Sequence, residues 1–366
     1  MIGDFSIFSA LLLISSFRLF RWGFIVLGVI LLGGLALPRL ASYGAPPTVK
    51  IGLVAPFEGL YRATGYEVLF AVKLALQERN GDQGLGGYRV ELVALNDFNE
   101  PTEAAKQARA LAADPDIVGV IGHLSSEATR AALPVYKEAE LAVVIPWSVE
   151  AELLEGQFPG VVSVAMTTKE AAQQLRAKSQ ALGFSQLETL SAFSPEPLPE
   201  TAQALELDTE AVTAGNIILA LQQQSRSLPL FGRVEVGNVQ LLQTAGAAAN
   251  GLIFVSPGPA AAQLPPNTTF EEAYQALSGL PPGPRAALAY EAANVLLDSI
   301  EQAIIHENDL YHPSPSRGAV SRQVGTIERS GLTGQLEFND HGQRLKPPVW
   351  FYQIVESRYP GILIGP

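Results

Sequence analysis

The chain has 366 residues, enough for two domains and a leader, and 48% of them are hydrophobic while only 16% are charged. A formal net charge of −12 argues against nucleic-acid binding, because phosphate contacts need clustered lysines and arginines. The absence of cysteine excludes disulfides, thiolate metal sites, cysteine nucleophiles and a lipid-modified cysteine anchor. The four histidines show no ligand-like spacing, so neither a metal nor a cofactor is predicted.

Residues 1–45 are predicted to be a targeting or anchoring segment. Residues 22–38 carry no charge and follow Arg18 and Arg21, the arrangement expected for a cytoplasmic N-terminal flank. A helix of this length spans about 25 Å, slightly less than the roughly 30 Å of a bilayer's hydrocarbon layer. The segment is therefore predicted to be a cleaved signal peptide or a membrane anchor, with the body of the protein outside the cytoplasm.

The body of the chain begins with alternating strand and helix patterns. A buried strand is expected over residues 49–56, and a helix over residues 64–79 follows a short loop. A second strand is expected over residues 88–95, and the next helix has Pro101 in its first turn. Strands that alternate with helices form parallel sheets, so the sequence predicts an α/β fold.

The stretch from residue 117 to residue 145 is predicted to be one strand–helix–strand unit. Residues 117–121 and 141–145 are short apolar runs, and residues 126–138 carry small apolar side chains at helical spacing. Ser125 or Ser126 can cap this helix, whose positive N-terminal end then faces the rim where open α/β sheets bind ligands. We therefore expect anion capture at this rim, with simple helix capping by the serines as the alternative.

The second half of the chain continues the alternation less regularly. A proline-rich stretch over residues 194–199 interrupts it. Helices are expected over residues 169–182 and 215–224, and strands over residues 186–193, 204–207 and 349–355, with residues 349–355 as the final strand.

Several segments resemble the branched-chain amino-acid (leucine/isoleucine/valine) binding proteins of ABC importers. The matching segments are Gly122-His123-Leu124-Ser125-Ser126, Glu78-Arg79-Asn80-Gly81, the turn from Asp97 to Pro101, residues 287–292 and residues 331–342. The resemblance covers most of residues 48–360. It implies an α/β fold with two doubly wound lobes of the type I periplasmic-binding-protein kind. The hydrophobic helix expected within residues 1–45 precedes these lobes.

The same resemblance implies the domain boundaries. Lobe 1 is expected to comprise residues 48–163 and 256–332, and lobe 2 residues 164–255 and 333–366. Relative to the family, about one helix–strand–helix portion is missing near the proline-rich stretch, so lobe 2 is expected to be reduced. In the family this portion carries a clamp residue that closes over the ligand.

The resemblance also implies a ligand site at the rim of lobe 1. In the family, the serine that matches Ser126 holds the α-carboxylate of the bound amino acid through its hydroxyl and backbone amide, and Ser125 precedes it. At a position where the family has threonine, this chain has Val149, which lacks a hydroxyl. The neighbouring Ser148 could supply that hydroxyl instead.

Other candidate contacts are aromatic or acidic. Trp147 could form an aromatic wall for a cation, and packing between lobes is the alternative role. Tyr61 and Arg62 could line the cleft or remain in a solvated loop. Glu210 and Glu235 lie near contact positions of the family, although surface acids are the simpler interpretation.

The leading interpretation is an extracytoplasmic solute-binding protein without enzymatic activity. It would trap a branched-chain amino acid or a similar small ligand between two closing lobes and deliver it to the membrane subunits of an ABC importer. The alternative is a membrane-anchored sensory or protein-interaction module with a degenerate pocket. An enzyme is disfavoured because no G-x-S-x-G elbow is present and because His123 and Ser125 are expected to point in different directions.

Overall fold

The computed structural model describes residues 46–365, except 82–83, 156–158, 193–200, 225–226, 267 and 308–313. The predicted leader over residues 1–45 lies outside the described residues. In the part of the chain that is described, no helix is both long and apolar enough to cross a membrane. Residues 48–366 form one compact unit.

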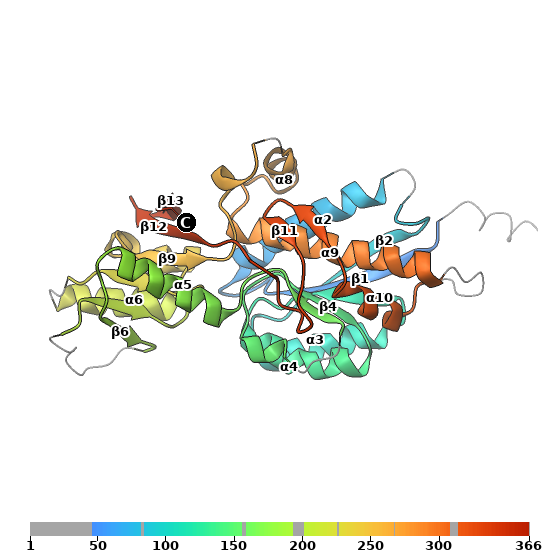
Figure 1. Ribbon diagram of the computed structural model, residues 1–366, viewed down its shortest axis with the longest axis horizontal. Helices are drawn as coiled ribbons and strands as arrows, with labels where there is room; N and C mark the ends of the chain where they lie inside the picture. Colours follow the sequence, from blue (N-terminus) through green and yellow to red (C-terminus); the bar gives the residue numbers. More distant parts are fainter. Residues whose placement is uncertain are drawn as a thin grey trace, which may run out of the picture. The chain divides into compact units, whose positions relative to one another are not determined.

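A five-stranded parallel sheet forms the centre of the first lobe. In spatial order, its strands are β2 (Arg89–Asn96), β1 (Thr48–Ala55), β3 (Ile117–Ile121), β4 (Ala142–Ile145) and β5 (Val161–Ser163). Helices α3 (Pro101–Ala113) and α4 (Ser126–Glu138) cover one face (Figure 1). Helices α2 (Arg62–Asn80), α9 (Pro284–Glu307) and α10 (Arg317–Val324) cover the other face.

The central strands of this sheet are buried on both faces, which explains why their sequences are continuous apolar runs. In β3, Ile117 and Val120 pack into the core beneath α3 and α4. Val118 and Ile121 pack into the core beneath α2 and α9. One strand thus joins two hydrophobic layers.

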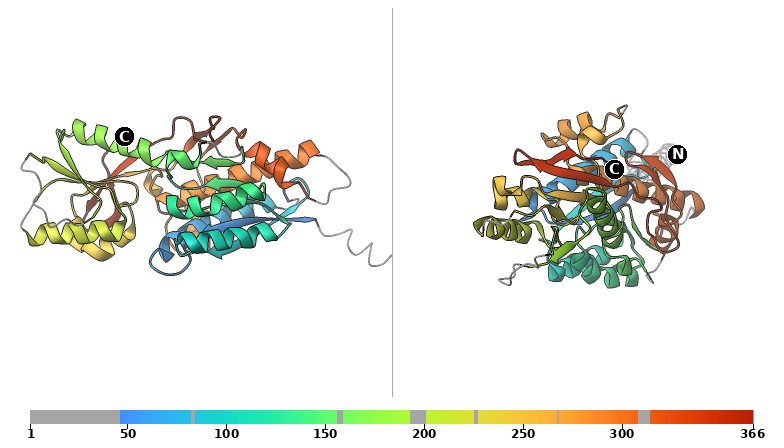
Figure 2. Two further views of the ribbon diagram at one scale, coloured as in Figure 1. Left: turned by 90° about the horizontal axis from the view of Figure 1, so that it is seen from below. Right: turned by 60° about the vertical axis from the view of Figure 1, so that its left-hand side comes forward.

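A six-stranded sheet forms the centre of the second lobe. In spatial order, its strands are β13 (Arg358–Leu363), β12 (Trp350–Val355), β9 (Ile253–Ser256), β8 (Leu230–Gly232), β7 (Ala204–Leu207) and β6 (Leu187–Leu190). Strands β6 to β9 are parallel, whereas β12 runs antiparallel to both of its neighbours. Helix α5 (Thr168–Ala181) lies on one face, and α6 (Ala211–Gln223) and α7 (Val239–Ala245) lie on the other (Figure 2).

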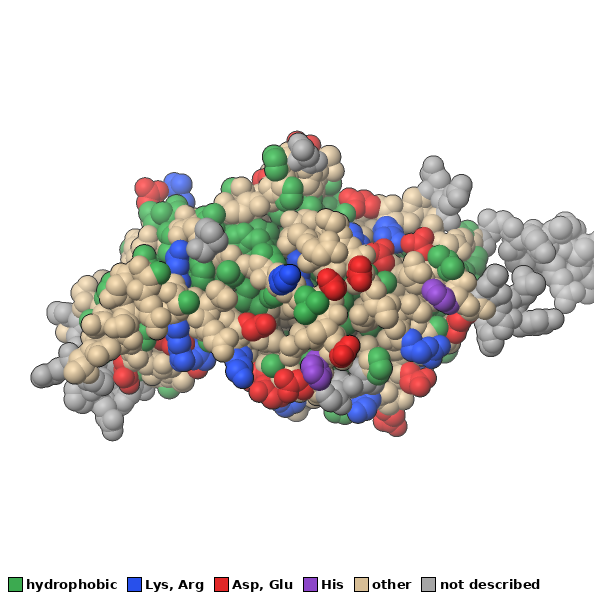
Figure 3. Space-filling view, in the orientation of Figure 1, with side chains coloured by type: hydrophobic (Ala, Val, Ile, Leu, Met, Phe, Trp, Pro, Cys, Tyr) green, Lys and Arg blue, Asp and Glu red, His purple; other side chains and the backbone are tan. Residues whose placement is uncertain are grey.

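Shorter elements complete the described chain. Helix α8 (Phe270–Ser278) packs on α2, and β10 (Arg329–Gly331) pairs with β11 (Gly334–Leu336) as a hairpin. Three short 3-10 helices span Ala151–Leu153, Gly246–Ala249 and Ala261–Gln263. Hydrophobic side chains gather over and beside β9, β12 and β13 on the face shown in Figure 3. The edge strand β13 also exposes Ile362 and Leu363.

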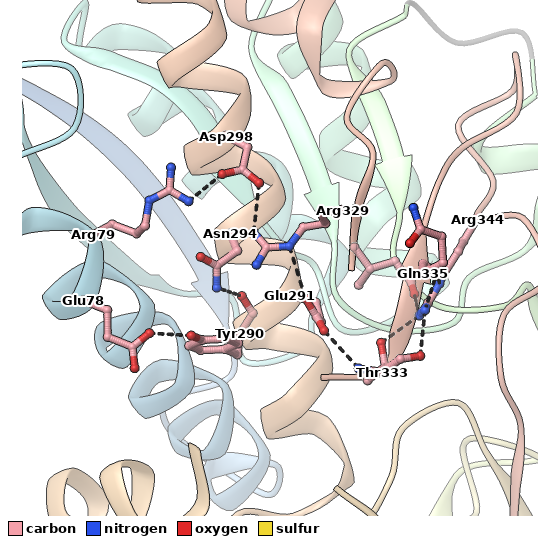
Figure 4. A network of polar contacts seen from close by, with 11 residues as sticks. Glu78, Arg79, Tyr290, Glu291, Asn294, Asp298, Arg329, Thr333, Gln335 and Arg344 are labelled. Carbon is pink, nitrogen blue, oxygen red and sulfur yellow. Dashed lines mark hydrogen bonds and ion pairs between the residues drawn. The ribbon is translucent and has the colours of Figure 1, made fainter. Parts of the chain in front are cut away.

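The chain passes between the two lobes three times, after β5, after β9 and before β12. Arg344 ties two of these connections together. Its Nη1 donates to the carbonyl oxygen of Val164 at 3.0 Å and to Oγ1 of Thr333 at 3.0 Å. Its Nη2 donates to the carbonyl oxygens of Thr333 and Gln335, both at 2.9 Å (Figure 4). This buried guanidinium fixes the path of the chain where the lobes join.

The observed elements match the local predictions best in the first lobe. The helix predicted over residues 126–138 is α4 with the same bounds, and the strand predicted over 117–121 is β3. The strand predicted over 349–355 is not the last one, because β13 follows it and pairs with it antiparallel. The expected reduction of the second lobe stays a prediction, since residues 193–200 lie outside the described chain.

Candidate functional site

A cavity of about 720 Å³ lies between the two lobes, next to the carboxyl ends of their parallel strands. This is where open α/β sheets bind ligands. Five of the six residues predicted to bind a ligand line this cavity, namely Tyr61, Ser125, Ser126, Trp147 and Ser148. Both candidate acids of the second lobe, Glu210 and Glu235, also line it.

Two adjacent serines at the start of α4 contribute differently to the first-lobe wall. Ser125 is the N-cap, and its Oγ accepts from the backbone amide of Ala128 at 3.4 Å. Ser126 is the first helical residue, and its Oγ accepts from the backbone amide of Glu150 at 3.1 Å. Since a hydroxyl also carries a proton, Ser126 can still donate to an anion in the cavity.

The turn that leads into α4 depends on a glycine. Gly122 follows β3 with φ of 138°, and a Cβ at this position would lie 2.5 Å from the carbonyl oxygen of Val54. No side chain fits there without a shift of the backbone, so only glycine suits this turn. The backbone can therefore pass close to β1 and carry the serines to the rim.

The segment after β4 supplies an aromatic ring and a hydroxyl. Trp147 is 4% exposed, and the guanidinium carbon of Arg285 lies 4.1 Å from its ring centroid. Ser148 is 3% exposed, and its Oγ has no hydrogen-bond partner among the residues that the structure describes. A buried hydroxyl without a partner is costly, so a ligand atom that bonds to it would be favoured.

Val149 is placed differently from the other predicted site residues. Its side chain is fully buried and packs with Leu153, Leu154 and Val161 beneath the sheet. Its carbonyl oxygen accepts from the backbone amide of Thr168 at 3.0 Å. Val149 does not line the cavity, because the chain turns its side chain into the core of the first lobe.

Tyr61 reaches across the cavity from the first lobe to the second. Its hydroxyl donates to Oε2 of Glu210 at 3.2 Å. Burial, together with the charge of Glu210, raises the pKa of Tyr61 well above its ordinary value. The neighbouring Arg62 is exposed and does not line the cavity.

The second-lobe wall carries two carboxylates that form no ion pair within the described chain. Burial raises the pKa of Glu210 and raises the pKa of Glu235 to about 7. Nearby Glu210 and Asp208 contribute to the shift at Glu235, and Arg233 opposes it. Arg233 neutralises neither Glu210 nor Glu235 directly, because its guanidinium forms ion pairs with two other carboxylates. These pairs join it to the fully buried Glu206 at 2.6 Å and to Asp208 at 2.5 Å.

His123 lies beneath the rim in a fully buried chain of side chains. Its Nδ1 is 2.7 Å from Oδ2 of Asp97, and its Nε2 is 3.1 Å from the hydroxyl of Tyr136. Both ring nitrogens are therefore engaged, and neither is left for Ser125. The cluster ties the ends of β2 and β3 to α4, which gives His123 a structural role.

Arg285 and Asn238 line the cavity, although no sequence pattern marked them as candidates. Asn238 Nδ2 donates to Oγ1 of Thr64 at 3.3 Å across the lobes. Arg285 follows a proline-rich turn at the start of α9, and nothing local distinguishes it from a surface arginine. Arg285 reaches the site because the chain crosses back from the second lobe to the first between β9 and α9.

A family model described as periplasmic binding protein matches residues 48–197. An amino acid binding protein of Pseudomonas aeruginosa is 30% identical over 144 residues, a match that covers 39% of this chain and only 37% of that relative. The leucine-, isoleucine-, valine-, threonine- and alanine-binding protein of the same organism is 22% identical over 352 residues, covering 85% of this chain and 91% of the relative.

Solved structures show the same fold. The branched-chain amino acid transporter substrate-binding protein of Streptococcus pneumoniae, solved with isoleucine, has a TM-score of 0.73 at 18% identity, covering 87% of this chain and all of that one. A leucine-binding protein of Thermotoga maritima has a TM-score of 0.73 at 20% identity, covering 85% and 96%. A solute-binding protein of R. palustris in complex with benzoate has a TM-score of 0.71 at 14% identity, covering 87% and 96%.

Proposed function

We propose that the chain belongs to the periplasmic binding-protein family that includes the branched-chain amino-acid binding proteins, and that it is the solute-binding component of an ABC importer. It binds a small amino-acid-like ligand outside the cytoplasm and delivers it to the importer's membrane subunits. Residues 1–45 direct the protein there as a signal peptide or hold it there as a membrane anchor. The protein binds its ligand without transforming it.

One observation carries this proposal: the cavity has an anion-binding wall opposite a cation-binding wall. The N-terminus of α4, with Ser125, Ser126 and the unpaired hydroxyl of Ser148, suits a carboxylate. Glu210 and Glu235 of the second lobe suit an ammonium group. An α-amino acid carries both charges on one carbon, so a single ligand can join the two walls.

Closure around the ligand completes the proposal. Residues 48–163 with 256–332, and residues 164–255 with 333–366, move as the two lobes, and the three connections between them act as the hinge. Tyr61 and Asn238 already contact the opposite lobe, so their hydrogen bonds favour the closed form.

A calorimetric screen of the full chain against the protein amino acids tests the function. Saturable binding of at least one amino acid is expected. If no amino acid or small carboxylate binds, the solute-binding function is wrong, and a sensory or interaction module becomes the better interpretation.

Ser126→Ala is expected to weaken binding of the amino acid by about 10- to 100-fold, because it removes a charge-assisted hydrogen bond to the carboxylate. Calorimetry gives the affinity, and urea denaturation without ligand gives the stability. Ser316→Ala is the matched control, since it removes the N-cap of α10 outside the cavity. The control should lose about 0.5–2 kcal/mol of stability at unchanged affinity. If Ser126→Ala binds the amino acid as tightly as the unmodified chain, the Ser126 hydroxyl does not contact the ligand. Its role would then be only to accept the hydrogen bond from the backbone amide of Glu150.

A further inference from the structure

Arg285 is a buried cation in the wall of the cavity. It is the second residue of α9 and is only 5% exposed. The carboxylate of Glu67 lies close by, but its Oε1 accepts from the backbone amides of Arg285 and Ala286 at 2.7 and 2.9 Å. Glu67 therefore caps the start of α9 and forms no ion pair with the guanidinium.

The guanidinium itself contacts only neutral groups in the described chain. Its Nη1 donates to the carbonyl oxygen of Gly237 at 3.3 Å and lies 3.5 Å from the hydroxyl of Tyr359. The guanidinium carbon lies over the ring of Trp147. Nε and Nη2 bond to none of the described residues. Arg176 and Arg233, which line the same cavity, are instead paired with Glu206.

Arg285 is therefore a buried positive charge in the cavity wall that forms no close ion pair with the described residues, and the carboxyl groups of Glu67 and Glu210 interact with it only at longer range. Lys169 also lines the cavity, but it is exposed to solvent. A guanidinium with little access to water is costly to bury unless an anion pairs with it. Its fork of N–H donors matches the two oxygens of a carboxylate, and the contact with the ring of Trp147 limits where the guanidinium can move. A ligand that brings a carboxylate to Arg285 removes the cost of burial.

An aliphatic ligand side chain finds little to pack against here. Beyond the ring of Tyr61, the apolar side chains that line the cavity are Pro56, Leu124, Trp147 and Ala172. Arg285 covers one face of Trp147. A leucine side chain in this place would shield the guanidinium from water without supplying a partner.

We propose that Arg285 determines specificity in this cleft and that the ligand is an amino acid with an acidic side chain. This inference rests on the proposed function, in which the α-carboxylate binds at α4 and the ammonium binds Glu210 and Glu235. The side-chain carboxylate then pairs with Arg285 beside Trp147. Three charges of the ligand thus meet three complementary groups of the cavity.

Calorimetry on the full chain with L-glutamate, L-aspartate, their amides L-glutamine and L-asparagine, and L-leucine tests this inference. At least one acidic amino acid should bind about 10-fold or more tightly than its amide and than leucine. Arg285→Gln should weaken binding of that acidic ligand by about 10- to 100-fold and change the affinity for its amide by less than about threefold.

Arg317→Gln is the matched control, because Arg317 is a part-buried arginine outside the cavity whose side chain donates only to carbonyl oxygens. It should leave the preference for the acidic ligand unchanged. Binding of leucine as tight as that of both acidic amino acids would overturn the assignment of Arg285 while leaving the proposed function in place. Failure to bind any amino acid would instead overturn the proposed function. If Arg285→Gln does not fold, the affinities of the unmodified chain for the acidic amino acids, their amides and leucine still test the proposed ligand class.

Discussion

Replacing Arg344 by methionine is expected to lower the free energy of unfolding by about 3–5 kcal/mol. Arg344 is 3% exposed and donates to carbonyl oxygens of Val164, Thr333 and Gln335. Methionine fills much of the same space but donates no hydrogen bond, so buried carbonyl groups lose their partners. Urea denaturation followed by circular dichroism measures the change.

Arg358→Met provides the comparison for this prediction. Arg358 is an arginine of the second lobe whose side chain is 79% exposed and whose ion-pair partner, Glu356, is 70% exposed. Its loss should change the free energy of unfolding by less than about 0.5 kcal/mol. If the two variants are equally stable, the bonds of Arg344 do not hold the lobe connections together.

Local pattern was sufficient to predict the N-terminal part of the first lobe, because its central strands are continuous apolar runs and its helices are regular. The unit formed by β3, α4 and β4 was predicted to within one residue, since helical periodicity and apolar strands lie side by side in the sequence. Helix α7 has only seven residues, too few to establish a periodicity, and was missed. Strand β13 was missed because it is an edge strand interrupted by Pro360 and Gly361.

The candidate site was predictable only where its residues are close in sequence. Ser125, Ser126, Trp147 and Ser148 follow two neighbouring strands of a parallel sheet, so the fold brings them together at one rim. Arg285 reaches the rim only through the tertiary path of α9. The sequence also could not predict where a side chain points outside a helix or strand. Val149, for example, follows β4 but points into the core and not into the cavity.

Glu206 illustrates the same limit in the second lobe. It lies in the centre of a strand whose four residues are all buried. A pattern of apolar residues gives no reason for a carboxylate there. Its burial is explained by ion pairs to Arg176 and Arg233, which come from α5 and from the loop after β8. Partners this distant in sequence are visible only in the folded chain.

Binding of an ammonium-bearing ligand is expected to weaken by about 10- to 30-fold between pH 7.5 and pH 5.5. Burial raises the pKa of Glu235 to about 7, so this carboxyl becomes protonated within that range and loses its attraction for the ammonium group. The same shift makes the free protein less stable as the pH rises from about 4.5 to 7, because the unfolded chain releases this proton earlier. The two effects of pH therefore have opposite signs.

Glu235→Gln separates this carboxyl from the other acids of the cavity. The variant should bind the amino acid more weakly at pH 7.5, and its affinity should depend far less on pH. Its free energy of unfolding at pH 7 should rise by about 1–3 kcal/mol relative to the unmodified chain, since a half-buried carboxylate without an ion pair has been removed. Calorimetry at pH 6.5 in buffers of different ionisation enthalpy should show proton release on binding by the unmodified chain and little release by the variant. If the variant keeps the full pH dependence, Glu210, which accepts the hydroxyl of Tyr61, holds the ammonium group instead.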